Sequence, residues 1–283
     1  MTHVIPCVVL LRFISVAMAH PIMRIQHSKS IWAFALSACL STQSAFAGII
    51  ISGTRVVYPA QSRDVTVQVS NTGESPALLQ VWMDDGNAKQ TPDESKVPFL
   101  VTPPISRVEP GSGQALRLFF TGATTLPQDR ESLFWLNVLE VPPAPLEHSG
   151  KSVPTSAEKS EPQNYLQLAF RSRIKVFYRP SGLKGTANEA PASLSWKLHS
   201  DGRVLVSNPT PYHVTLTRTE ALDEKGSKEV IDKAGVLLAP GQQHTFQANT
   251  SGGHSSRWKS VSFTFINDYG GIVTQNIDLG SMP

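Results

Sequence analysis

Residues 65–73, VTVQVSNTG, show the clearest structural pattern of the chain. Val65, Val67 and Val69 alternate with polar residues, which is the period-two pattern of a β-strand with one buried face. An Asn-Thr-Gly segment at 71–73 follows, and these residue types favour turns because they adopt turn conformations at little cost. The stretch therefore predicts a short strand that ends in a turn.

The same pattern recurs in both directions from this stretch, with almost no helical periodicity after residue 47. The predicted strands lie at 77–83, 116–120, 133–141, 165–178, 193–196, 203–207, 212–219, 236–238, 244–247, 261–266 and 272–279. Short strands separated by turn residues are typical of β-sandwiches. We therefore expect an all-β chain with two sandwich domains, residues 48–180 and 191–283, joined by a hinge at 181–190.

Residues 1–47 have the features of a cleaved signal peptide. A basic segment that begins at Met23 precedes an apolar run at 31–40. Ala45-Phe46-Ala47 is then a small-x-small cleavage site in front of Gly48. The apolar run is too short to cross a bilayer, so we expect a mature chain that begins at Gly48.

Two features of this leader allow more than one interpretation. A further apolar stretch at 4–19 precedes it, and a misplaced start codon explains that stretch, with Met18 or Met23 as the true start. A double or anchored leader is the alternative. In addition, the segment 36–39 resembles a lipoprotein cleavage box, which would make Cys39 a lipidated terminus.

Removing the leader changes the charge and the cysteine content. Three of the 25 Lys and Arg residues and none of the 22 Asp and Glu residues lie in 1–47, which leaves 22 basic against 22 acidic residues. A neutral mature chain gives little support to a nucleic-acid-binding role. Both cysteines, Cys7 and Cys39, also lie in the leader, so the mature domains must be held together by core burial without a disulfide.

Five segments, in chain order, resemble the PapD-like periplasmic pilus chaperones. They are TRVVYP at 54–59, LPQDRESLFW at 126–135, RIKVFYRP at 173–180, NPTPY at 208–212 and INDYGG at 266–271. Members of this family consist of two immunoglobulin-like β-sandwich domains set at an angle. The resemblance therefore implies this fold and a periplasmic location.

The resemblance also implies a mechanism. In this family a pilus subunit is an incomplete sandwich, and the chaperone lends it the missing strand, which is called donor-strand complementation. The subunit's C-terminal carboxylate is held in the cleft between the chaperone domains. The implied function is to fold, cap and deliver fimbrial subunits, and the implied partners are those subunits and an outer-membrane usher, without cofactor or nucleic acid.

The donor strand would present Leu166, Leu168 and Phe170. An exposed apolar row on an edge strand is an aggregation hazard unless a partner covers it. The free protein is therefore expected to self-associate through this strand. Period-two alternation alone favours the other interpretation, in which these residues face the protein's own core, because it does not tell which face is buried. The resemblance reverses that preference.

By the same resemblance, Arg55 and Lys175 are the carboxylate anchor. A guanidinium and an ammonium group can together neutralise and hydrogen-bond a terminal carboxylate. The alternative is that both are solvated charges at strand edges. In a regular strand Lys175 lies on the opposite face from Phe170, so a strand twist or a bulge would have to reconcile the two roles.

A third set of residues matches an interdomain charge cluster of the family that sets the angle between the domains. The set comprises Arg107, Glu131 and Asp268. Two carboxylates around one guanidinium are chemically reasonable. The alternative for each residue is an exposed ion pair, worth less than about 1 kcal/mol.

The loop at 142–163 departs from the family pattern. It contains five prolines among mostly polar or charged residues, so it cannot contribute to a core and is expected to be mobile. It is longer than the loop of the subgroup that builds thick pili. The long-loop subgroup usually has a disulfide beside this loop, and this mature chain has no cysteine. The sequence therefore does not assign the chain to either the short-loop or the long-loop subgroup.

Other functions find little support in the sequence. There is no Gly-x-Ser-x-Gly, His-Glu-x-x-His or phosphate-binding glycine loop, and the histidines lack ligand spacing. We therefore expect neither enzyme activity nor a bound metal. DDGN at 84–87 indicates a turn rather than a calcium loop. The alternatives are a secreted adhesin or carbohydrate-binding protein, with Trp258 as its one loop-edge aromatic, and a hydrolase with a site grafted on the sandwich.

Overall fold

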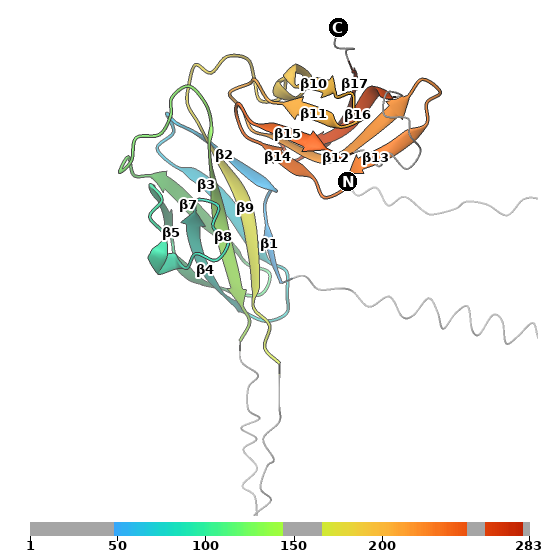
Figure 1. Ribbon diagram of the computed structural model, residues 1–283. Helices are drawn as coiled ribbons and strands as arrows, with labels where there is room; N and C mark the ends of the chain where they lie inside the picture. Colours follow the sequence, from blue (N-terminus) through green and yellow to red (C-terminus); the bar gives the residue numbers. More distant parts are fainter. Residues whose placement is uncertain (1–47, 144–165, 248–257, 280–283) are drawn as a thin grey trace, which may run out of the picture. The chain divides into compact units, whose positions relative to one another are not determined.

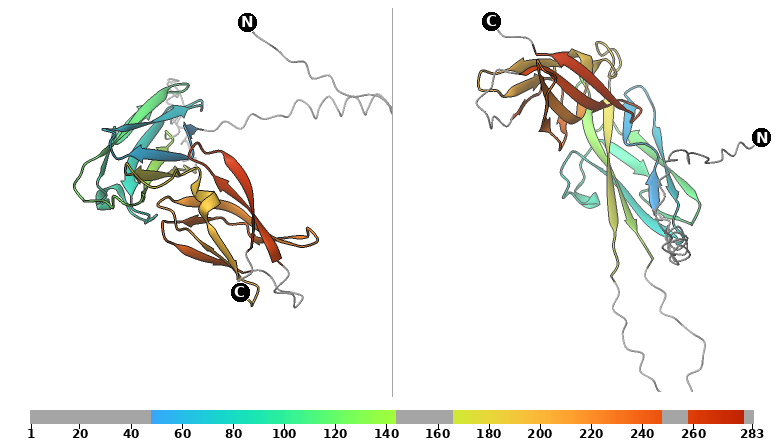
Figure 2. Two further views of the ribbon diagram at one scale, coloured as in Figure 1. Left: turned by 90° about the horizontal axis from the view of Figure 1, so that it is seen from above. Right: turned by 90° about the vertical axis from the view of Figure 1, so that its right-hand side faces the viewer.

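The computed structural model describes residues 48–143, 166–247 and 258–279. These residues form β-strands and two short 3-10 helices, arranged as two β-sandwiches (Figures 1 and 2). The predicted all-β fold with two sandwich domains is confirmed. The predicted leader, with Cys39, and residues 144–163 of the predicted loop lie outside the described residues. Among the described residues, no helix is long and apolar enough to cross a membrane.

The first sandwich consists of two sheets. One sheet has the strand order β1-β3-β7-β5, with β1 at Ile49–Ile51, β3 at Val65–Asn71, β7 at Gly113–Phe120 and β5 at Phe99–Thr102. The other has the order β2-β9-β8-β4-β6, with β2 at Arg55–Pro59, β9 at Phe170–Arg179, β8 at Ser132–Val141, β4 at Ala77–Asp84 and β6 at Ile105–Val108. A 3-10 helix, η1 at Pro92–Glu94, lies between β4 and β5.

The two sheets enclose one apolar core because alternate residues of their strands face inward. In β3, Val67 and Val69 are buried while Gln68 is exposed, as the alternation predicts. Tyr58 is fully buried, and its hydroxyl accepts a hydrogen bond from the amide of Phe120 at 3.0 Å. Each large apolar side chain buried in this way contributes about 1.5–3 kcal/mol to stability. This core fixes the sheet that carries β9.

The pairing of β2 leaves part of β9 without a neighbour. The chain passes from β1 in one sheet to β2 in the other through residues 52–54, where Gly53 has a φ of 93°. Strand β2 then pairs in parallel with β9, beginning at Arg55 opposite Lys175. Among the described residues, Phe170–Ile174 pair with β8 alone. One edge of this half of β9 is therefore free.

Strand β9 is shorter than the predicted strand at 165–178. It begins at Phe170, and residues 166–169 have no regular structure. Its partner at this end is β8, and the last pair of the two strands is Glu140 with Phe170. Strand β8 ends one residue later, at Val141. Pro142 and Pro143 follow, and proline has no amide proton to extend a ladder of hydrogen bonds. The predicted strand start was wrong for this reason.

The second sandwich is built in the same way. Its three-stranded sheet has the order β10-β11-β15, with β10 at Ser195–Leu198, β11 at Val204–Ser207 and β15 at Gln243–Phe246. Its larger sheet has the order β13-β12-β16-β17, with β13 at Lys228–Asp232, β12 at Val214–Asp223, β16 at Trp258–Ile266 and β17 at Ile272–Asp278; β14 at Val236–Leu238 pairs with β12. A 3-10 helix, η2 at Ala190–Ser193, precedes β10.

Asn208 holds the loops of the second sandwich together from inside. Its buried side-chain amide donates to the carbonyl oxygens of Tyr212 at 2.7 Å, Leu238 at 3.1 Å and Ala239 at 3.2 Å. Its Oδ1 atom accepts hydrogen bonds from the backbone amide and the hydroxyl of Thr210. A buried amide with this many partners explains why the NPTPY segment at 208–212 keeps a fixed shape.

Replacing Asn208 by Ala should lower the free energy of unfolding by about 1–3 kcal/mol, because the buried carbonyl groups lose their donor. Urea unfolding of the purified protein measures this. Asn87→Ala is the control, since Asn87 is exposed and makes a local turn contact to the Lys89 amide. Equal stability of the two variants would contradict the role given to Asn208.

Candidate functional site

Strand β9 alternates between the two faces of its sheet without interruption. Ile174, Val176 and Tyr178 belong to the core of the first sandwich, and the residues between them lie on the outer face. The pairing with β8 shows no register shift over its whole length. Lys175 therefore stays on the opposite face from Phe170, and the bulge considered from the sequence is absent from β9.

The predicted apolar row is exposed. The exposed fraction is 83% for Leu166, 53% for Leu168 and 62% for Phe170. Phe170 lies on the same face of β9 as Ile174, so its ring continues the core-facing side of the strand beyond the end of the core. These three residues are therefore not part of the protein's own core.

Arg55 and Lys175 are neighbours across the β2–β9 pairing, at the point where β2 begins. The Nη1 atom of Arg55 donates to the carbonyl oxygen of Ile266 at 2.9 Å. The Nε atom of Arg55 is buried and has no hydrogen-bond partner in the described part of the chain. The Nζ atom of Lys175 lies 5.1 Å from the centre of the Trp135 ring. Two cations thus share one short stretch of the outer face.

The surroundings disfavour the charge on both residues. Burial lowers the pKa of Arg55, against the attraction of Asp268 and Glu131. Burial also lowers the pKa of Lys175, and repulsion from Arg55 lowers it further. No ion pair within the described ranges includes either cation. An anion bound between them would relieve both effects, and a carboxylate has the charge and the acceptor atoms for this.

A hydrogen-bonded cluster holds the free half of β9 from the outer face. At its centre the carboxylate of Asp84, which is fully buried, accepts from Nη2 of Arg173 at 2.6 Å and from Nδ2 of Asn137 at 2.7 Å. The Oδ1 atom of Asn137 accepts from Nε and Nη2 of Arg171 at 2.9 and 2.6 Å. We call Asp84, Asn137, Arg171 and Arg173 the outer-face cluster.

Aromatic rings complete the contacts of the two arginines. The guanidinium carbon of Arg171 lies 4.6 Å from the centre of the Trp82 ring, and that of Arg173 lies 4.7 Å from the centre of the Trp135 ring. Each contact of this kind adds about 0.5–2 kcal/mol of attraction. The cluster and the rings therefore hold residues 170–174 in an extended conformation although β2 does not pair with them.

The outer-face cluster was not predicted from the sequence. The turn predicted for DDGN at 84–87 is present, and the Gly86 amide donates to Oδ1 of Asp84 at 2.7 Å. The contact of Asp84 with Arg173 spans 89 positions of the chain and leaves no local pattern. The available signal was the pair of arginines at 171 and 173 on one face of a predicted strand, because charges that are buried in a fold are paired.

A second cluster contains two of the three predicted charge-cluster residues. The Nε atom of Arg179 donates to Oε1 of Glu131 at 2.7 Å, and its Nη1 atom donates to Oδ2 of Asp268 at 2.7 Å. Glu131 is buried, and its Oε2 atom accepts from the backbone amide of His213 at 2.8 Å. Burial lowers the pKa of Arg179, but the hydrogen bonds and charges of Asp268 and Glu131 raise it overall.

The assignment of Arg107 to this cluster was wrong. Its Nε atom instead donates to Oε1 of Glu109 at 2.8 Å, and 66% of its side chain is exposed. The reason is the strand order: Arg107 lies on β6, at the opposite edge of the sheet from β2. Arg179, at the end of β9, supplies the guanidinium that the pattern of two carboxylates requires.

Two other interpretations from the sequence can be compared with the structure. Among the described residues, no group of three or more His, Cys, Asp or Glu side chains could hold a metal ion. Trp258, which the adhesin hypothesis needed as a loop-edge aromatic, is 4% exposed and belongs to the core of the second sandwich. The candidate site consists of an exposed apolar row, a free strand edge and a pair of cations.

Comparisons with known proteins assign both sandwiches to one family. Residues 48–184 match the family model of the pili and flagellar-assembly chaperone PapD N-terminal domain, and residues 189–277 match that of the pili assembly chaperone PapD C-terminal domain. Chaperone protein FimB/FhaD of Bordetella pertussis is 46% identical over 81% of this chain and 87% of its own. Probable fimbrial chaperone YadV of Escherichia coli is 41% identical over 89% of this chain and 99% of its own.

A solved complex is also similar. In the structure of the Salmonella enterica SafA pilin in complex with the SafB chaperone, the matching chain is 26% identical, with a TM-score of 0.63. The match covers 84% of this chain and 98% of that chain.

Replacing Arg179 by Ala should destabilise the protein by about 3–5 kcal/mol, because it leaves the buried carboxylate of Glu131 without its cation. Arg107→Ala is the matched control and should change the free energy of unfolding by about 0.5 kcal/mol or less. Thermal or urea unfolding of both variants measures the difference. A larger loss from Arg107→Ala would restore the assignment made from the sequence.

Proposed function

The chain belongs to the PapD family of pilus assembly chaperones, and we propose that it captures fimbrial subunits by donor-strand complementation in the periplasm. The subunit would be an incomplete immunoglobulin-like fold that takes up residues 166–174 as its missing strand. Its C-terminal carboxylate would bind Arg55 and Lys175. The chain acts as a chaperone and not as an enzyme.

The observation that carries this proposal is the position of the two cations relative to the free edge. Strand β2 occupies the edge of β9 from Lys175 onward. A strand added to residues 170–174 must therefore end where β2 begins, beside Arg55 and Lys175. If that end is the subunit's C-terminus, its carboxylate meets the two cations, and the added strand runs parallel to β9, as β2 does.

The charges of Arg55 and Lys175 would make this position selective for the C-terminus of a chain. A terminal carboxylate offers two acceptor oxygens and one negative charge, while an internal segment of a chain offers neither at that position. Charge-assisted hydrogen bonds contribute about 1.5–3 kcal/mol each. The partly buried cations of this chain would give up little hydration on binding, because burial has already removed part of it.

The apolar row supplies the second part of the binding surface. In strand addition, backbone hydrogen bonds provide affinity and alternate side chains fill pockets of the partner. Leu166, Leu168 and Phe170 are exposed in the free protein, so they are available to fill a groove from which a strand is missing. Delivery of the captured subunit to an outer-membrane usher completes the proposed function.

Lys175→Met should weaken subunit capture by about 10- to 100-fold, which corresponds to one charge-assisted bond. It should not lower stability at neutral pH, because burial disfavours the charged amine. The lowered pKa means that the folded wild type gains stability as the pH rises from this lowered value toward the ordinary pKa of lysine. The difference in free energy of unfolding between the variant and the wild type should therefore shrink over that pH range.

Capture of a purified subunit and pH-dependent urea unfolding measure these effects. Lys184→Met is the matched control, since Lys184 is exposed. Arg55→Ala should weaken capture to a similar extent. A Lys175→Met protein that unfolds would identify Lys175 as a structural charge and contradict the anchor.

Phe170→Asp should abolish subunit capture and leave the fold intact, because the side chain is exposed in the free protein. Binding of a hydrophobic dye should fall as well, since the exposed apolar row becomes smaller. Leu100→Asp is the control: Leu100 is 58% exposed on β5, in the other sheet. It should reduce dye binding without affecting capture. Equal loss of capture from both changes would argue against a specific donor strand.

A further inference from the structure

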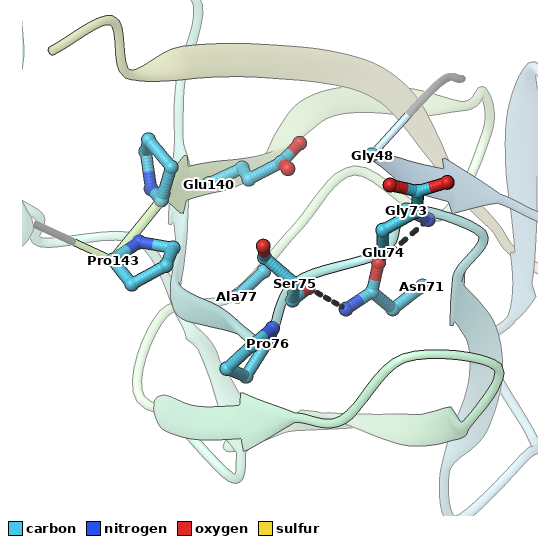
Figure 3. Close-up of a pocket in the computed structure, with 10 residues that line it drawn as sticks. Gly48, Asn71, Gly73, Glu74, Ser75, Pro76, Ala77, Glu140 and Pro143 are labelled. Atoms are coloured by element: carbon cyan, nitrogen blue, oxygen red, sulfur yellow. Dashed lines mark hydrogen bonds between the residues drawn. The ribbon is translucent and has the colours of Figure 1, made fainter. Parts of the chain in front are cut away.

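A small pocket lies at the end of the first sandwich, at some distance along β9 from the two cations. Figure 3 shows its lining, which includes the carboxylate side chains of Glu74 and Glu140 together with Gly48. The complete lining is Gly48, Asn71, Gly73, Glu74, Ser75, Pro76, Ala77, Glu140, Pro142 and Pro143. This lining holds two acidic residues and no basic one. The pocket is therefore suited to a cationic group.

Gly48 is held in this pocket by its neighbours. Its carbonyl oxygen accepts a hydrogen bond from the Thr72 amide at 2.9 Å. The next amide, that of Ile49, donates to Oε2 of Glu140 at 3.1 Å. The carboxylate of Glu140 thus lies directly at the start of β1, and Gly48 has a defined position against it.

The absence of a side chain at position 48 allows this close approach. A β-carbon built on Gly48 would lie 2.9 Å from Cδ and 3.0 Å from Oε2 of Glu140, and its contact with Oε1 would be closer still. Contacts this short force one of the groups to move. The backbone nitrogen of Gly48 is bonded to the same α-carbon, which keeps it in the vicinity of this carboxylate.

The sequence gives this nitrogen a particular chemistry. Ala45-Phe46-Ala47 is the cleavage site predicted from the sequence for the leader, and the proposal below depends on it. Hydrolysis of the peptide bond between Ala47 and Gly48 consumes one water molecule, leaves a carboxylate on Ala47 and releases the nitrogen of Gly48 as an α-ammonium group. This creates a cation near the carboxylate of Glu140, which has no ion-pair partner among the described residues.

We propose that this pocket is the docking site of the mature N-terminus, in which the α-ammonium of Gly48 forms an ion pair with Glu140. The ion pair exists only after leader removal, because an amide nitrogen carries no charge. Glu140 pairs with Phe170 across β8 and β9, so the docked terminus also fixes the end of the strand pair that carries the donor segment. Processing would thereby complete the first sandwich.

The test uses the full chain, secreted with its own leader and purified. Intact mass should show Gly48 as the first residue. At neutral pH the α-amine of the wild type should react with an amine-specific reagent at least several-fold more slowly than that of Glu140→Gln. Glu74→Gln should show a smaller change, because Glu74 is exposed and contacts no residue of β1 within the described part of the chain.

A chemical cycle separates the ion pair from a general loss of stability. N-terminal transamination replaces the α-amine by a carbonyl and leaves lysine amines intact. Transamination and Glu140→Gln should each lower the thermal midpoint of the protein, and the two together should lower it no further than one alone. Subunit capture through Lys175 should persist in all of these forms, which distinguishes this site from the donor-strand proposal.

Three results would overturn the proposal: a first residue other than Gly48, equal reactivity of the α-amine in wild type and Glu140→Gln, or fully additive losses in the cycle. If Glu140→Gln fails to fold, the thermal midpoints of transaminated and untreated wild type, measured in low and in high salt, still test the ion pair. The ion pair predicts a difference in thermal midpoint that shrinks with salt. An unchanged difference would contradict it.

Discussion

The constraint on which the site depends is that β2 covers only half of β9. Its pairing begins at Arg55 opposite Lys175, and residues 170–174 keep one free edge in the described chain. A free edge of this kind normally invites aggregation. Here it adjoins an exposed apolar row and two cations that form no ion pair within the described residues. A partner strand that ends in a carboxylate would pair with the edge, cover the apolar row and neutralise the cations.

A half-paired strand needs other contacts to stay extended, and the outer-face cluster supplies them. Asp84 is completely buried and binds Arg173, while Asn137 receives the hydrogen bonds of Arg171. Buried ion pairs contribute little net stability, because desolvation opposes their attraction. Their effect here is to fix one conformation. A strand that is already extended loses less conformational entropy on binding than a flexible one.

The features that depend on local sequence could be predicted. The alternation at 65–71 and the five family segments were sufficient for the sandwich fold, and the position of Arg55 beside Lys175 follows from two of those segments. The features that depend on pairing between distant residues could not be predicted. The choice between Arg107 and Arg179 depends on strand order, and the contact of Asp84 with Arg173 spans 89 positions. The three-residue strand β1 was missed because so short a run carries almost no periodicity.

Amide hydrogen exchange of residues 170–174, measured with and without a purified fimbrial subunit, shows whether the subunit pairs with the free edge of β9. In the free chaperone, the amides on the free edge should exchange rapidly, because they have no strand partner. In the complex they should be strongly protected, while the amides of residues 55–59 and of β5 should change little. Protection that appears elsewhere, with residues 170–174 unchanged, would contradict capture of the subunit at this strand edge.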